Sequence, residues 1–254
     1  MNGAFYVGAT GLSSQQRALE VVAANIANIN TPAFKRSQVR FSQLLSATAP
    51  ADAPAGSPAT LPVLAGVAAD GERRVFTQGE VKATGEPMDL AIEGDGFVEL
   101  AGPAGETLLW RGGKLKIGRD GFLAADNGLP LKAMISVPLE ATRLTIDRGG
   151  VVRATGPEID EEIGEIELVR VGDPVALRSA GEALYQIDDE TLLTPAAPGE
   201  EGAGVLVQGA VEGSNVELSE EMIMLLLMQR AYAANAQVVQ AGDQLMAIAN
   251  GLRR

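Results

Sequence analysis

Two stretches with the same apolar spacing, one at each end of the chain, constrain the fold more than any other feature. The N-terminal stretch advances by alternating steps of four and three residues through Phe5, Ala9, Leu12, Gln16, Leu19, Ala23 and Ile26. The C-terminal stretch advances in the same way through Leu218, Met222, Leu225, Gln229, Tyr232, Ala236 and Val239. This spacing is typical of a narrow seam along an α-helix. We therefore predict two terminal helices that pair as a coiled coil.

An ordinary amphipathic helix on a globular core is the alternative interpretation of each seam. Gly3, Gly8 and Gly11 argue against it, since each glycine costs about 1 kcal/mol relative to alanine inside a helix. Such a helix is marginal on its own and needs neighbours. The alanines and glutamines of the seams also bury little surface within one chain. This combination favours helices that pack against partner chains.

The residue types that are missing exclude most kinds of chemistry. The chain of 254 residues has no cysteine and no histidine. Disulfides and thiolate metal sites are therefore impossible, and the commonest general base and metal ligand is absent. We predict that the chain is not an enzyme and has no catalytic residue, metal site or cofactor. The net charge of −13, without a local cluster of Lys or Arg, disfavours nucleic acid as a partner.

Neither a secretion signal nor a membrane span is expected from the sequence. The first residues, MNGAFYVGATGLSSQQR, have no basic region before an apolar stretch, so they do not form a Sec-type signal. The longest apolar run, Met222 to Met228, is too short to cross a bilayer.

Composition divides the chain into four predicted parts. Residues 1–45 hold the first helix and a short extended or helical segment, and residues 46–72, rich in Ala, Pro and Gly, are predicted to be an extended linker arm. Residues 73–208 are predicted to form a β-rich domain, and residues 209–254 to form the C-terminal helix, with Ser214, Asn215 or Ser219 near its start. The predicted fold class is α+β, with a mainly antiparallel β domain inserted between the paired helices.

The β-rich part is recognised by short apolar runs separated by glycine turns. The expected strands include MDLAI, FVEL, LLW, KLKI, FLAA, RLTI, VVRA and IGEIELVRV. The expected hairpin turns are Asp95–Gly96, Gly112–Gly113, Asp120–Gly121 and Gly149–Gly150. This pattern predicts a meander within a β-sandwich or a barrel-like domain.

No motif in the chain carries a convincing site. The GDGF segment at 94–97 lacks the third glycine of a dinucleotide fingerprint, and the acidic runs Asp160–Glu162 and Asp188–Glu190 are typical of a solvated face. A cell-wall hydrolase or a free binding module is the competing hypothesis. It would require two carboxylates facing one cleft of the β domain.

Three segments resemble the bacterial flagellar rod and hook protein family. ANIANINTPAFKRSQVRFSQLL at 24–45 is similar to the N-terminal signature, and RVFTQGEVKATGEPMDLAIEGDGFVEL at 74–100 is similar to the start of the family's β domain. The segment from 207 to 246, with EGSNV and QRAY, resembles the C-terminal signature. GATGLSSQQ, FKRS and FSQLL look most like the distal rod member. Two phrases depart from the pattern: Pro32–Ala33 stands where Thr-Gly or Pro-Gly is usual, and Leu109–Gly113 replaces Tyr-Thr-Arg-Asp-Gly.

The resemblance implies a structural subunit of the flagellar basal-body rod in the periplasm, and a proximal rod or hook-type subunit is the alternative within the family. It implies a helical homopolymer that forms a hollow drive shaft and transmits torque. The implied partners are neighbouring rod and hook proteins, bushing rings in peptidoglycan and outer membrane, and the flagellar type III export apparatus. The predicted subunit-interface residues are Phe5, Leu12, Leu19, Ile26, Asn28, Phe34, Met222, Leu225, Gln229, Arg230, Tyr232 and Val239.

Overall fold

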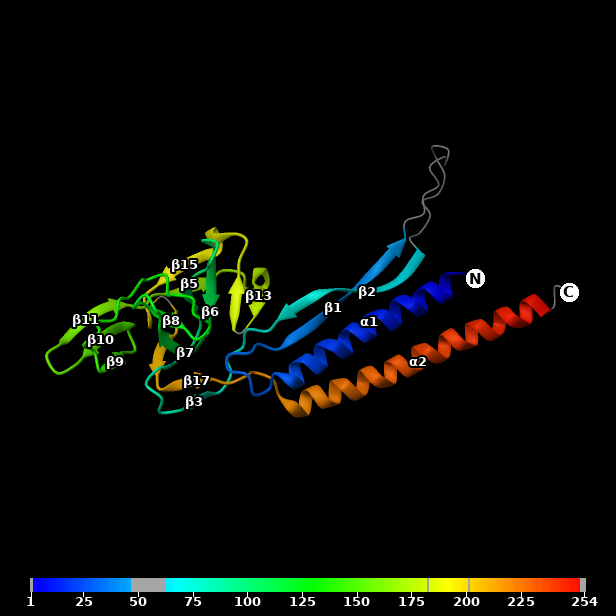
Figure 1. The fold of residues 1–254 in the computed structure, drawn as a ribbon. Coiled ribbons are helices and arrows are strands. Elements are labelled where there is room, and N and C mark those ends of the chain that lie inside the picture. The colour runs from blue at the N-terminus through cyan, green and yellow to red at the C-terminus, as the bar shows by residue number, and fades with distance from the viewer. Residues whose placement is uncertain (1, 47–62, 182, 201, 252–254) are drawn as a thin grey trace, which may run out of the picture. The chain divides into compact units, whose positions relative to one another are not determined.

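The computed structural model describes residues 2–46, 63–181, 183–200 and 202–251, which fall into two compact units (Figure 1). The helix unit comprises Met1–Ala27, Ser37–Val75 and Glu217–Arg254, and the β unit comprises Asn28–Arg36 and Phe76–Val216. Both terminal helices and the antiparallel strands are present, so the α+β class is confirmed.

The helix unit contains the two predicted helices, α1 (Asn2–Ala27) and α2 (Leu218–Gly251). Helix α1 ends just before the Asn-rich segment, as the competition of Asn and Thr side chains with the helical backbone predicts. Helix α2 carries Glu220 and Glu221 in its first turn, where negative charge meets the positive end of the helix dipole. Among the described residues, neither helix is both long and apolar enough to span a membrane.

A long β-hairpin is the element of this unit that the sequence did not predict. Strand β1 (Ser37–Ser46) pairs antiparallel with β2 (Val63–Arg74), from Ser37 opposite Arg74 to Ser46 opposite Val63. Residues 63–72 were expected to belong to an extended linker arm, for which both a disordered loop and an arm that orders against a neighbour were open, and they form most of strand β2. Residues 47–62 of that arm lie outside the described residues. The small residues that give β2 its linker-like composition allow it to lie close against α1, where the Ser14 hydroxyl donates to the Val67 carbonyl at 2.9 Å.

The β unit consists of short antiparallel strands arranged in several open ladders. Its sheets have the strand orders β16-β4-β7-β8, β13-β14-β6-β5, β11-β10-β9, β12-β15 and β17-β3. The strands are β3 (Val81–Ala83), β4 (Asp89–Glu93), β5 (Val98–Ala101), β6 (Thr107–Trp110), β7 (Gly112–Ile117), β8 (Leu123–Ala125), β9 (Arg143–Ile146), β10 (Val151–Thr155), β11 (Asp160–Glu165), β12 (Leu168–Val171), β13 (Arg178–Gly181), β14 (Leu184–Gln186), β15 (Leu193–Ala196), β16 (Val205–Gln208) and β17 (Ala210–Glu212). Two short 3-10 helices, Pro174–Ala176 and Glu190–Leu192, lie between strands.

The predicted strands are present, but their connections differ from a simple meander. Asp120–Gly121 and Gly149–Gly150 join paired strands, as expected of hairpin turns. Asp95–Gly96 instead links strands of different sheets, and Gly112–Gly113 opens β7. Gly112 has φ of 110°, and a Cβ there would come within 2.7 Å of the Leu90 carbonyl oxygen, so this glycine serves close strand packing.

Two further expectations about the β unit require correction. The segment IGEIELVRV was expected to be one strand, but it is divided between β11 and β12, which belong to different sheets. Ile166, between the two strands, is fully buried in the larger core, and its N–H donates to the Gly150 carbonyl at 2.8 Å. A single sandwich or barrel was also expected, whereas the described strands form the separate open ladders given above.

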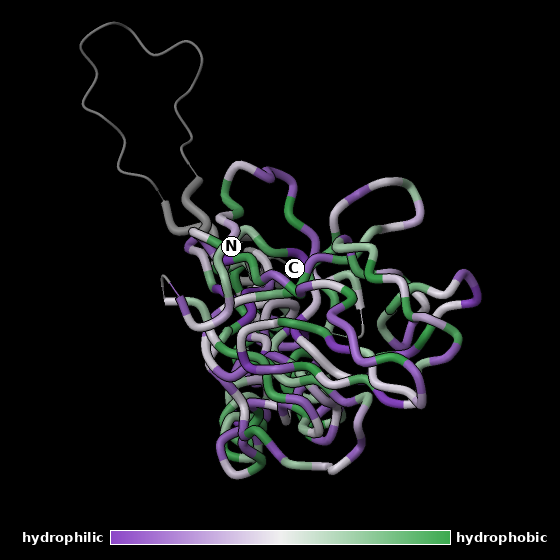
Figure 2. Tube along the Cα trace, turned by 90° about the vertical axis from the view of Figure 1, so that its left-hand side faces the viewer, coloured by the Kyte–Doolittle hydropathy of each residue, from purple (hydrophilic) through white to green (hydrophobic). Residues whose placement is uncertain are grey.

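Aliphatic side chains fill the larger core of the β unit, as the low aromatic content predicts. Leu90, Ile92 and Leu100 are fully buried in it, with Trp110 at its edge. A second cluster contains an aromatic trio of Phe76, Phe97 and Tyr185, whose edge-to-face rings have centroids 5.0 to 5.8 Å apart. Hydrophobic and hydrophilic stretches alternate at short intervals along the chain trace (Figure 2), as expected of strands that each have one buried face.

Candidate functional site

Helices α1 and α2 run antiparallel side by side within the helix unit (Figure 1). Near the start of α1, a Cβ at Gly8 would lie 2.6 Å from the Val239 Cγ2 atom, and one at Gly11 would lie 3.0 Å from the Asn235 Nδ2 atom. Near its end, the side chain of Asn25 donates to Glu221. The glycines that lower helix propensity therefore allow the close approach of the two helices.

The faces by which the helices contact each other overlap the predicted seams only in part, since Val239 of the C-terminal seam lies against Gly8. The buried positions of α1 are Gly8, Ser14, Ala18, Val21, Val22 and Asn25. The seam residues Ala9, Gln16 and Ala23 are exposed instead. Helix α1 packs against both β2 and α2, so its buried positions cover a wider arc than a single seam.

Helix α2 exposes many large apolar side chains on the side that α1 leaves uncovered. Ile223 is 61% exposed, Leu227 is 53% exposed and Val238 is 59% exposed. We call this set the outer apolar face of α2, and it consists of Met222, Ile223, Leu226, Leu227, Val238 and Ile248. A helix that is apolar on all sides is normally buried on all sides. The outer apolar face is therefore the strongest candidate functional site of the molecule.

Most residues of the outer apolar face were missed by the sequence prediction, which named only Met222 among them. The signal was present in the run MIMLLLM at 222–228, because seven consecutive apolar residues must lie on every side of a helix. A single seam that advances by four and three residues includes only some of the residues in such a run.

The predicted interface residues lie in three different situations. Met222, Gln229, Arg230 and Tyr232 are exposed on α2. Those that are half-buried are Leu12, Leu19, Ile26, Asn28, Phe34, Leu225 and Val239. Phe5 lies on α1, and its side chain is outside the described residues. Asn28 and Phe34 belong to the β unit, where both bond to Thr31 in a turn. The role of all these residues in assembly stays a prediction.

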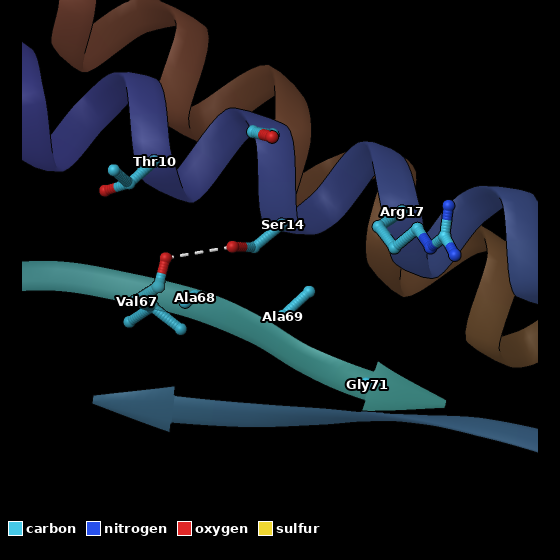
Figure 3. Close-up of a pocket in the computed structure, with 8 residues that line it drawn as sticks. Thr10, Ser14, Arg17, Val67, Ala68, Ala69 and Gly71 are labelled. Carbon is cyan, nitrogen blue, oxygen red and sulfur yellow. Dashed lines mark hydrogen bonds between the residues drawn. The ribbon is translucent and has the colours of Figure 1, made fainter. Parts of the chain in front are cut away.

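A groove of about 440 Å³ lies between α1 and β2 (Figure 3). Helix α1 contributes Thr10, Ser13, Ser14 and Arg17 to it, and β2 contributes Val67, Ala68, Ala69 and Gly71. Ser14 is committed to its hydrogen bond with the Val67 carbonyl, drawn as a dashed line, and Arg17 lies 3.7 Å from Glu20. The groove exists because the side chains on β2 are small. The groups that line it are polar and aliphatic side chains of the kind found on most protein surfaces.

The β unit contains a buried ion cluster formed by Lys35, Arg111 and Glu212. One Glu212 oxygen accepts from Lys35 Nζ at 2.5 Å and from the Gly79 N–H at 2.9 Å, and the other accepts from Arg111 Nε at 2.9 Å. The Arg111 guanidinium also donates to the carbonyls of Gly94 and Gly96. The side chains of Lys35 and Glu212 have no exposed surface, and that of Arg111 has 4%. Burial lowers the pKa of Lys35, and the charge of Glu212 opposes this shift.

The ion cluster joins the segments by which the chain enters and leaves the β unit. Ala33 donates its N–H to the Glu212 carbonyl at 2.7 Å, and the Arg36 N–H donates to the Asn215 side chain at 2.7 Å. Asn215 also donates to Thr77. Residues of the segments TPAFK (31–35) and EGSNV (212–216) therefore contact one another within a single chain. Ala33, where a glycine is usual in the family, has a left-handed φ of 54°.

The cleft that a hydrolase would need was sought among the carboxylates of the β unit. A groove of about 370 Å³ is lined by Glu99, Glu165 and Glu167, but Glu99 pairs with Lys132 at 2.9 Å. Among the described residues, no three or more acidic side chains are grouped so that they could hold a metal ion.

Comparison with known families identifies matches in three separate parts of the chain. Residues 5–35 match the model of the flagella basal body rod protein, and residues 91–154 match the D1 domain of the flagellar hook protein FlgE/F/G. Residues 207–252 match the C-terminal model of the flagellar basal body rod FlgEFG protein. The first and last of these matches contain α1 and α2.

Relatives that match over almost their full length are also flagellar basal-body rod proteins. The flagellar basal-body rod protein FlgG of Caulobacter vibrioides is 33% identical over 98% of this chain and 99% of its own length. FlgG of Borreliella burgdorferi is 33% identical over 100% of both chains, and FlgF of Caulobacter vibrioides is 32% identical over 96% and 95%. The chain therefore belongs to the flagellar basal-body rod protein family, as a structural component of the rod and not as an enzyme.

Proposed function

We propose that the chain polymerises with copies of itself, and that the outer apolar face of α2 is a main contact between subunits. The carrying observation is that Met222, Ile223, Leu226, Leu227, Val238 and Ile248 remain between 53% and 61% exposed after the chain has folded. Burying one Leu or Ile side chain contributes about 1.5–3 kcal/mol, so several of them together stabilise an interface substantially. A second copy is the occupant because a rod is built by repeating its own subunits.

The pairing of α1 with α2 as a coiled coil, and the interface residues named from the sequence, belong to the same proposal. Tyr232 and Met222 support it, since both are exposed on α2 at 42% and 56%. In a helical array of subunits, such side chains become buried by neighbouring copies. The array would form a hollow shaft that transmits torque across the periplasm.

The remaining partners follow from membership of the rod family. We place the chain in the distal rod, because its relatives include FlgG proteins that match over almost the whole of both chains; a proximal position is the alternative that the FlgF relative supports. Neighbouring rod and hook proteins would contact the ends of the polymer. Bushing rings would surround the shaft, and the flagellar type III apparatus would export the unfolded chain.

The experiment compares the double variant Ile223→Asp/Leu227→Asp with the wild-type chain in assembly. An aspartate buried without a partner costs several kcal/mol at every subunit, so we expect the variant to stay monomeric in sedimentation and electron microscopy and to abolish motility in cells. The melting temperature of the β unit should not change. Ile117→Asp is the matched control, because Ile117 is an isoleucine 50% exposed on the β unit. Polymers of the double variant that equal those of the wild type would contradict the proposal.

A further inference from the structure

Apolar burial alone does not select one register for the pair of α1 and α2. From Met222 to Ile248 the charged residues of α2 are only Arg230 and Asp243. Apolar side chains lie both on the side of α2 that faces α1 and on its outer apolar face. A slip of α2 by one or two turns, or a rotation about its axis, would exchange one apolar side chain for another at the contact. Another feature must therefore specify the pairing.

A buried polar cluster lies at the one end of this apolar contact where three elements meet. The Asn25 side chain of α1 donates to the Ser37 carbonyl of β1 at 2.9 Å and to the Glu221 carboxylate of α2 at 3.2 Å. Its oxygen accepts from the Ser37 N–H at 2.9 Å. Asn25 and Glu221 are each only 1% exposed. We call Asn25, Ser37 and Glu221 the Asn25 cluster.

Close contacts far from the Asn25 cluster agree with its register. Gly11 lies fourteen residues before Asn25 on α1, and its neighbour Asn235 lies fourteen residues after Glu221 on α2. Gly8 and Val239 continue the same antiparallel alignment to within one residue. A slip of one helical turn would place the Asn25 amide and the Glu221 carboxylate against apolar side chains, which is costly for both groups.

We propose that Asn25 and Glu221 are positioning residues that fix the axial register of the α1–α2 pair and the rotation of α2 about its own axis. Buried polar residues in otherwise apolar helix contacts are known to select one alignment at some cost in stability. In this chain the selection decides which side of α2 is covered by α1 and which side remains as the outer apolar face. The proposal concerns the helix pair of a single chain, so it is tested without polymerisation.

The absence of cysteine makes disulfide trapping a direct probe of this register. In the full-length protein, the pair Gly8→Cys/Val239→Cys reports the native register, because a Cβ at residue 8 would lie 4.0 Å from the Val239 Cβ atom. This spacing is within the range of a disulfide, about 3.5–4.5 Å between Cβ atoms. The pair Gly11→Cys/Gly242→Cys reports a slip of two turns, about 10 Å along the helix. Dilute, monomeric protein is oxidised mildly and the cross-linked fraction of each pair is measured.

The deciding variant is Asn25→Leu/Glu221→Leu, which replaces both partners by apolar side chains of similar size. Asn25→Leu also removes both hydrogen bonds to the Ser37 backbone, so we expect a lower stability. The apolar contacts along the two helices are unchanged, so the helical circular dichroism should be retained. The ratio of native to slipped cross-link should fall about tenfold, as expected for the loss of one hydrogen bond to a buried charged group.

Two controls separate register from stability. Glu20→Leu removes a half-exposed carboxylate of α1 and should leave the cross-link ratio unchanged. Glu221→Gln retains a hydrogen-bonding partner for Asn25 and should keep most of the native ratio. An unchanged ratio in Asn25→Leu/Glu221→Leu would overturn the proposal. Loss of the helical signal in that variant would also overturn it, because the pair would then act through stability alone.

Discussion

The β unit and the helix unit differ in how completely one chain buries its own apolar side chains. Leu90, Ile92 and Leu100 of the β unit have no exposed surface, whereas Ile223 and Val238 of the helix unit are about 60% exposed. The β unit also pairs its buried charges within the same chain. The β unit is therefore complete within one chain, and the exposed face of the helix unit is the feature on which the proposed contact between subunits rests.

The largest expected effect comes from changing the buried charges of the β unit. This change tests whether the β unit depends on pairing its charges within one chain. The ion cluster contains two cations and one anion, so Glu212→Gln leaves Lys35 and Arg111 buried without a counter-ion among the three. We expect a loss of about 3–5 kcal/mol in the free energy of unfolding of the β unit. Lys35→Met, which leaves one cation and one anion, should cost clearly less. Chemical denaturation of both variants measures the two costs, and equal costs would refute the role of charge balance.

The predicted domain boundary at residue 208 offers a second test. A fragment of residues 73–208 lacks Lys35 and Glu212 and leaves Arg111 buried without its carboxylate. A fragment of residues 73–216 restores Glu212. We expect the longer fragment to be more stable by about 3 kcal/mol, the cost of breaking a buried ion pair. Thermal melts followed by circular dichroism would show this, and identical melts would mean that the domain folds from residues 73–208 alone.

Limited proteolysis compares the two units directly in the intact monomer. Because the helix unit keeps a large apolar face in water, we expect its local opening to cost less free energy than opening of the β unit. Protease applied to dilute protein should cleave outside Phe76–Val216, which is the larger segment of the β unit. Mass spectrometry of the resistant core identifies the sites. Equal protection of both units would remove the contrast between them.

The smallest expected effect is at Ala33, the family position where glycine is usual. Its φ of 54° is a left-handed conformation that costs roughly 1–2 kcal/mol for a residue with a side chain. Ala33→Gly relieves this strain, but it increases the entropy of the unfolded chain and removes a buried methyl group. We expect a net gain of at most about 1 kcal/mol in the β unit. Pro32→Ala serves as a neighbouring control, and a clear destabilisation by Ala33→Gly would contradict the strain.

Most local elements could be predicted because their signals are local. The runs of β4 to β10 lie between turn residues, and the Asn-rich segment marks the end of α1 within a few residues. The hairpin was missed because the small residues of β2 have the composition of a linker, and only the neighbouring α1 gives them a surface to pack against. The segment IGEIELVRV was predicted as one strand for a similar reason. The alternation of apolar and polar residues continues through Ile166, the buried residue between β11 and β12.

The sequence by itself determined two terminal helices, a middle region of short antiparallel strands, and the absence of cysteine and histidine chemistry. It also carried the motifs of the rod family. Only the tertiary structure decided which helix faces meet, that Lys35, Arg111 and Glu212 share one buried site, and that Asn25 contacts Glu221. The physical reason is that periodicity and turn chemistry act between residues close in the chain. The pairing of a buried charge depends on which distant segments fold around it, and those segments lie up to 196 residues apart.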